Sequence, residues 1–245
     1  MKFLLGILGL LLGVAVAIIG FGRIDHLRQV APSQLPAWTD TVSGASGLLA
    51  GRAQVATPFA PLDLDWRLDG LSAAGPDWQA SLTGTGVAMT GKVSAHAPFD
   101  TVVLSQGRGI VDLALVSADM PLSIPAGVLR FDRLDAQYRL SDQRLVQLVG
   151  EGRIQGLSFG GDALSDGTFR LRADVGGGWR LEFDIPDGPV AGLGGTASGR
   201  LDRVQATLAA TLVPGPQMPP DWSDALLYWG DKTEDGNWRL RLSVP

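Results

Sequence analysis

The segment at 86–93, GVAMTGKV, has the residue types of a phosphate-binding loop. Four residues separate Gly86 from Gly91-Lys92, the spacing at which backbone N–H groups surround phosphate oxygens and a lysine reaches the terminal phosphates. A Ser or Thr that could hold Mg²⁺ should come next, but the chain has Val93. No helix pattern follows, although such a loop opens a helix. The sequence therefore predicts a strand whose glycines ease close approach, and no nucleotide site.

The other residues suited to chemistry do not form a recognisable active site. His26 and His96 are the only histidines and there is no cysteine, so three converging zinc ligands are not expected. Asp63 and Asp65 would lie about 7 Å apart on one face of a strand, a separation that glycosidases use. Adjacent outward carboxylates are nevertheless ordinary on a wet strand face. The serines at 43–47 do not match the nucleophile elbow. We therefore expect no enzyme and no catalytic, cofactor-binding or metal-binding residues.

The composition indicates a folded protein that does not bind nucleic acid. Hydrophobic residues make up 45% and charged residues 18% of the 245-residue chain, which is too apolar for disorder. The net charge is −5 and no basic run occurs, whereas nucleic-acid binding needs clustered cations. The 33 glycines and 15 prolines indicate many turns between strands. The absence of cysteine excludes disulfides and thiolate chemistry.

An apolar run at the N-terminus predicts a membrane anchor. The run from Phe3 to Phe21 contains no charge and no proline, and a helix of this length spans roughly the ~30 Å hydrocarbon core of a bilayer. Ala15-Val16-Ala17 offers a signal-peptidase site, but the apolar residues continue beyond it, which favours an uncleaved anchor. The residues expected within the membrane include Phe3, Leu4, Leu12, Val16, Ile19 and Phe21.

The organisation that follows is a signal anchor at 1–22, a juxtamembrane segment at 23–40 and a β-rich periplasmic domain at 41–245. We therefore expect a single-pass protein of the inner (plasma) membrane, with most of its chain in a periplasm-like space. Long trailing domains translocate largely regardless of flanking charges.

Period-2 alternation beyond residue 60 predicts strands. The final strand is the clearest, with Trp238, Leu240, Leu242 and Val244 alternating with polar residues, which means that one face is buried and one is wet. Turn signals such as Asp235-Gly236 separate the runs. A Trp-Arg-Leu triplet recurs, and its aromatic residues are expected in the core: Trp66, Trp179 and Trp238.

The expected fold is all-β, an antiparallel meander of many short strands behind a single N-terminal transmembrane helix. The sheet could be an open curled sheet, a barrel or a sandwich. One short helix is expected at 221–229, after two prolines.

Several segments in this order resemble a known family. These are VSGASGLLAGRA at 42–53, LDLDWRL at 62–68, and DGPV at 187–190 followed by Gly194-Gly195. Together with the anchor they resemble the type II secretion system protein N family, the general secretion pathway N proteins of Gram-negative bacteria. The family's early block usually carries a Trp, which 47–51 lacks. The resemblance implies an accessory component of the inner-membrane secretion platform that acts by protein–protein contacts with other platform proteins.

A second interpretation is consistent with the same sequence features. A long meander with one apolar face also resembles AsmA-like periplasmic proteins, whose sheets form a trough that binds or shuttles lipid. A trough leaves its apolar face uncovered, whereas a closed barrel or sandwich buries it. The sequence leaves both interpretations open, with lipid as a further candidate partner.

Overall fold

The structure is a computed structural model. It describes residues 42–43, 49–55, 61–73, 75–96, 100–114, 126–139, 141–142, 144–159, 162–200, 206–228 and 230–244. The expected anchor at 1–22 and juxtamembrane segment at 23–40 lie outside these residues. Among the helices of the described residues, none is long and apolar enough to cross a membrane.

The fold is all-β, with a single open antiparallel sheet of 15 strands. Of the three arrangements expected from the sequence, the open sheet is the one observed. The strands are β1 (Val42–Ser43), β2 (Ala50–Val55), β3 (Leu62–Ser72), β4 (Gly75–Gly84), β5 (Val87–His96), β6 (Thr101–Asp112), β7 (Ala126–Arg139), β8 (Arg144–Phe159), β9 (Asp162–Ala163), β10 (Gly167–Ala173), β11 (Gly178–Ile185), β12 (Ala191–Arg200), β13 (Ala206–Pro214), β14 (Gly230–Lys232) and β15 (Trp238–Val244).

Strands that are neighbours in sequence are almost always hydrogen-bonded neighbours. The order is β1 to β8 in sequence, then β10 to β13, β15 and β14, with β9 paired only to β8. The expected short helix is present as α4 (Pro220–Leu226), which ends earlier than the sequence suggested. It precedes the hairpin of β14 and β15, whose Asp235-Gly236 turn has the glycine at φ 82°.

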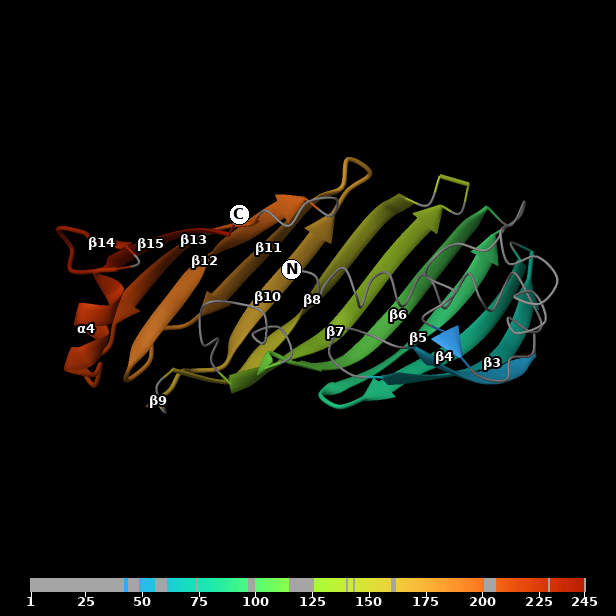
Figure 1. The fold of residues 1–245 in the computed structure, drawn as a ribbon, viewed down its shortest axis with the longest axis horizontal. Helices are drawn as coiled ribbons and strands as arrows, with labels where there is room; N and C mark the ends of the chain where they lie inside the picture. Colours follow the sequence, from blue (N-terminus) through green and yellow to red (C-terminus); the bar gives the residue numbers. More distant parts are fainter. Residues whose placement is uncertain are drawn as a thin grey trace. The chain divides into compact units, whose positions relative to one another are not determined.

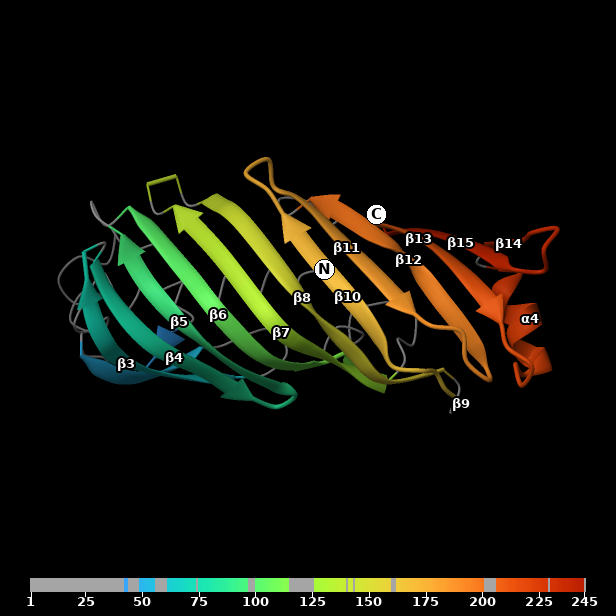
Figure 2. The ribbon, with the colours of Figure 1, turned by 180° about the vertical axis from the view of Figure 1, so that it is seen from behind.

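The chain divides into two compact units, and each is described by itself. The N-terminal unit comprises Lys2–Ile110 and Arg133–Leu148, and the C-terminal unit comprises Val111–Asp132 and Val149–Pro245. Within the N-terminal unit, β3, β4 and β5 lie side by side (Figure 1). Within the C-terminal unit, β10 to β13 do the same, as the view from behind shows (Figure 2).

The apolar face of the N-terminal unit is well buried. Register places Leu64 opposite Leu82, and Leu82 opposite Met89, so apolar side chains form continuous rows across β3, β4 and β5. Leu64 and Leu82 are each 1% exposed, and Trp78 is 0% exposed. Burying a side chain of this size stabilises a fold by roughly 1.5–3 kcal/mol. These rows form the core of this unit.

The central strands are longer than the short strands expected from the sequence. β6, β7 and β8 have 12, 14 and 16 residues, against roughly 3–10 for most strands. In β8 the buried positions change from even to odd between Ile154 and Leu157, and Gly156 between them has φ 62°. A positive φ and a switch of face are typical of a β-bulge. The bulge breaks the alternation in the sequence while the strand continues.

Carboxylates satisfy the backbone at these irregular positions. Gly156 donates its backbone N–H to Asp166 Oδ1 at 3.2 Å. In β6, Gln106 has φ 55° and donates its N–H to Asp135 Oδ1 at 3.1 Å. An irregular residue loses its regular ladder bonds, so each carboxylate replaces a bond that the neighbouring strand does not supply.

Candidate functional site

Residues 87–93 of the loop-like segment lie in β5, as the sequence predicted, whereas Gly86 lies in the turn before that strand and has φ 70°. Gly91 and Lys92 belong to β5, and a Cβ at Gly91 would come 2.8 Å from Leu104 Cδ1 and 3.2 Å from Gly107 Cα. A side chain at this position would crowd Leu104 and the backbone at Gly107, so glycine eases the approach of β5 to β6. Lys92 Nζ lies 3.0 Å from Asp77 Oδ2, so this lysine neutralises a neighbouring carboxylate.

Asp77 is the most strongly perturbed carboxylate near this lysine. The Ser94 hydroxyl donates to Asp77 Oδ1 at 2.5 Å, and this hydrogen bond lowers the pKa of Asp77, assisted by Lys92 and opposed by burial. The Asp77 side chain is 14% exposed. The group is thus held as a carboxylate by its partners, which is a structural role.

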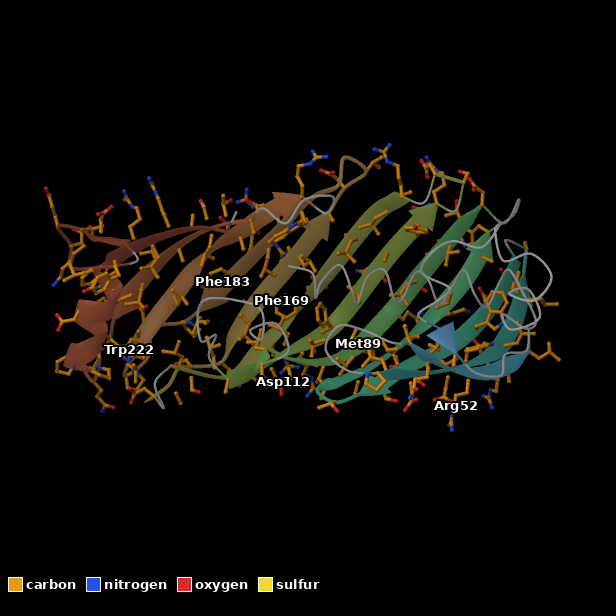
Figure 3. All side chains as sticks on the ribbon, in the orientation of Figure 1. Arg52, Met89, Asp112, Phe169, Phe183 and Trp222 are labelled. Atoms are coloured by element: carbon orange, nitrogen blue, oxygen red, sulfur yellow. The ribbon has the colours of Figure 1, made fainter. Side chains whose placement is uncertain are left out.

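The carboxylate pair considered for glycosidase chemistry is occupied by cross-strand partners. Arg52 Nε donates to Asp65 Oδ1 at 2.7 Å, and Gln54 Nε2 donates to Asp63 Oδ1 at 3.5 Å. The bond from Arg52 to Asp65 raises the pKa of the Arg52 guanidinium. Figure 3 shows Arg52 at the margin of its unit. The geometry is that of surface pairing between β2 and β3.

The described residues also contain no group of three or more His, Asp or Glu side chains arranged to hold a metal. His96 ends β5, and His26 lies outside the described residues. The chemistry-bearing residues are therefore dispersed over the described strands.

The apolar face of the C-terminal unit is less completely buried than a closed core would be. The register places Leu171 opposite Leu181, Leu181 opposite Ala197, and Ala197 opposite Leu208. Partners directly opposite share one face of a sheet, so apolar side chains form rows across β10, β11, β12 and β13. Figure 3 labels Phe169 and Phe183, which are register partners on β10 and β11.

Part of this face is only partly buried. On β10, Phe169 and Leu171 are 4% and 2% exposed, and Phe131 packs edge-on against Phe169 with ring centroids 5.0 Å apart. The neighbouring strands are less covered. We define the apolar patch as seven partly exposed residues of β11, β12, β13 and β15: Trp179, Leu181, Phe183, Leu193, Ala197, Leu208 and Leu240.

Two glycines of β12 lie on the face of the patch and contribute no side chain to it. Phe183 faces Gly195, which in turn faces Ala210. A Cβ at Gly195 would come 2.5 Å from the Ala209 carbonyl oxygen and 2.7 Å from Ala210 Cα. Trp179 faces Gly199 in the same way. β12 has no side chain at Gly195 and Gly199, so Phe183 and Trp179 of β11 have no side chain directly opposite them on β12.

The three tryptophans expected in the core have different environments. Trp66 and Trp238 are 4% and 3% exposed, whereas Trp179 is only partly buried. The difference follows from neighbours, because Trp179 faces Gly199 on β12. The residues expected in the membrane (Phe3, Leu4, Leu12, Val16, Ile19 and Phe21) lie outside the described residues.

Sequence reasoning missed the patch as a site. Period-2 alternation beyond residue 60 predicts one buried face on each strand, so it does not distinguish this patch from a core. The signal available was the run of small residues in β12, AGLGGTASGR, which supplies little side-chain volume to cover its neighbours.

Comparison with known proteins identifies no relative. No family model, no curated protein and no solved structure matches this chain.

Proposed function

We propose that this protein is a non-catalytic binding protein whose C-terminal unit holds a lipid acyl chain against the apolar patch, as in an AsmA-like trough. The observation that carries the proposal is the partial exposure of Leu181, Phe183 and Leu208 on an open sheet. Their neighbours Leu171 and Ile185 on the same face are 2% exposed.

The chemistry of the patch favours an aliphatic ligand. Apart from the Trp179 indole N–H, its side chains carry no hydrogen-bonding group. An extended peptide would bring backbone N–H and C=O groups that need partners, whereas an acyl chain brings none. Burying about six methylenes would contribute roughly 5 kcal/mol, at ~0.8 kcal/mol each.

The proposal includes a location. The apolar run from Phe3 to Phe21 would anchor the chain in the inner membrane, with the sheet in the periplasm. An anchor of this kind would keep the patch beside a source of lipid.

A second candidate is an accessory role in type II secretion through contacts with other inner-membrane platform proteins. The observation that favours it is the resemblance in sequence to the protein N family. Its best-matching block, LDLDWRL at 62–68, lies in β3. This role would depend on protein contacts, by strand addition or in a groove.

One experiment separates the two candidates. The full chain would be cross-linked briefly in cells and purified from membranes, and the co-purified lipids and proteins would be identified by mass spectrometry. The lipid proposal predicts a stoichiometric phospholipid. Platform subunits with lipid at background would instead favour the secretion role and refute the lipid proposal.

A matched pair of variants locates the ligand. Ala197→Asp places a carboxylate within the patch, whereas Ala209→Asp places one on the opposite face, where register sets it beside Arg241. We expect Ala197→Asp to lose the lipid and Ala209→Asp to retain it, because a charge under an acyl chain is desolvated. Circular dichroism would verify that both variants fold. Equal lipid content in the two would argue against the patch as the site.

A further inference from the structure

The polar face of the C-terminal unit carries an arrangement that neither candidate function uses. The register places Arg172 of β10 directly opposite Arg180 of β11. Arg180 is opposite Ser198 of β12, and Ser198 is opposite Thr207 of β13. We call these four residues the arginine–hydroxyl row. Because they alternate with the residues of the apolar patch, they lie on the other face of the sheet.

Two arginines directly opposite each other are unfavourable in a sheet. Like charges at such positions destabilise the pairing. Some other cations of the sheet face acids directly, as Arg52 faces Asp65, Arg170 faces Glu182 and Arg239 faces Asp231. The Arg172–Arg180 pairing is therefore a local excess of positive charge on a chain whose net charge is −5.

The internal acid nearest to this pair neutralises it only in part. Arg180 Nε lies 3.0 Å from Glu182 Oε1, and both side chains are exposed, at 62% and 49%. That contact uses one of the five N–H donors of a guanidinium. Within the described part of the chain, Arg172 forms no ion pair within 4.0 Å. The row thus keeps most of its guanidinium donors.

The row continues with neutral hydrogen-bonding groups. The Ser198 and Thr207 hydroxyls lie 3.1 Å apart and either can donate to the other. When Thr207 is the donor of that bond, the Ser198 hydroxyl hydrogen remains for an oxygen ligand. Neighbouring strands are about 4.8 Å apart. The guanidinium and hydroxyl donors on adjacent strands are therefore close enough to bind neighbouring oxygen-bearing groups of a ligand.

We propose that the arginine–hydroxyl row binds a phosphate group. Guanidinium groups bind phosphate oxygens bidentately, with charge-assisted hydrogen bonds. The two arginines would take the charged oxygens, and the Ser198 hydroxyl would donate to a third. The phosphate could belong to a lipid headgroup or be free in solution, since the recognised chemistry is the same. The site lies on the face opposite the apolar patch, so it does not depend on the proposed acyl-chain site.

Native mass spectrometry of the full chain in a non-ionic detergent tests this. One arm adds equal phosphatidylglycerol and phosphatidylcholine, and the other adds inorganic phosphate. The test variant is Arg172→Gln with Arg180→Gln. The control is Arg52→Gln, which removes an exposed cation of similar size that faces Asp65. Removing two charge-assisted contacts should weaken binding roughly tenfold or more.

The outcomes are distinct. A preference for phosphatidylglycerol that the double variant loses and Arg52→Gln keeps supports the proposal with a lipid headgroup as the source. Phosphate adducts that follow the same pattern, without a lipid preference, support it with free phosphate as the source. Equal binding by wild type and double variant, or no binding of either probe by wild type, overturns it. Phosphatidylcholine also carries a phosphate, so only the phosphatidylcholine that the double variant retains reports on the apolar patch. Failure of that proposal would therefore be seen separately.

Discussion

The uncovered patch predicts a difference in stability between two leucines in one row. Leu171 and Leu181 are direct register partners on the same face of β10 and β11. Leu171 is 2% exposed, whereas Leu181 is partly exposed. Leu171→Ala should destabilise the C-terminal unit by about 3–4 kcal/mol, because it removes buried contacts and leaves a cavity. Leu181→Ala should cost less, about 1–2 kcal/mol, since part of the side chain is already in water.

Urea unfolding of the lipid-free full chain would measure both values. Intrinsic tryptophan fluorescence can follow the transition, because Trp238 in the same unit is 3% exposed. The two variants lie in one unit, so the same transition is compared even if the two units unfold separately. Equal losses for the two variants would refute the reasoning, because they would mean that Leu181 is covered as fully as Leu171. Added phospholipid should enlarge the effect of Leu181→Ala alone.

Three further predictions concern the framework. The lowered pKa of Asp77, caused first by the Ser94 hydrogen bond, contributes stability that is present above the usual carboxyl pKa of about 3.9 and is lost as pH falls through the folded value. Thermal melts below pH 4 should therefore depend less on pH in Ser94→Ala. Gly152→Ala should destabilise by roughly 1–3 kcal/mol in urea unfolding, because its Cβ would overlap the Arg130 carbonyl oxygen. Asp166→Ala should cost about 1 kcal/mol by removing the acceptor of a bulge N–H, and hydrogen exchange at that amide should accelerate.

Local periodicity was readable without the structure. The alternation in 238–244 matches β15, the Asp235-Gly236 turn closes its hairpin, and residues 87–93 of the loop-like segment lie in a strand. These features depend on residues close in sequence, because side chains on a strand alternate between faces whatever the strand pairs with.

The central strands were harder to predict because bulges interrupt their pattern. The buried positions of β8 shift at Gly156, and those of β6 shift near Gln106. At each site the compensating carboxylate comes from another part of the chain, Asp166 in one case and Asp135 in the other. A short window of sequence around the bulge residue does not include the carboxylate that bonds to it.

The pattern of residues predicts a chain rich in strands with one apolar and one polar face, since that property belongs to each strand separately. Whether the sheet is open depends on whether its first and last strands pair, which is a property of the tertiary structure. The strand order ends at β1 and β14, so the sheet is open. The tertiary structure also decided that Trp238 is buried while Trp179 is partly exposed. Each of these tryptophans begins a Trp-Arg-Leu triplet, but its burial depends on the residue opposite it on the neighbouring strand. That residue is Leu212 for Trp238 and Gly199 for Trp179.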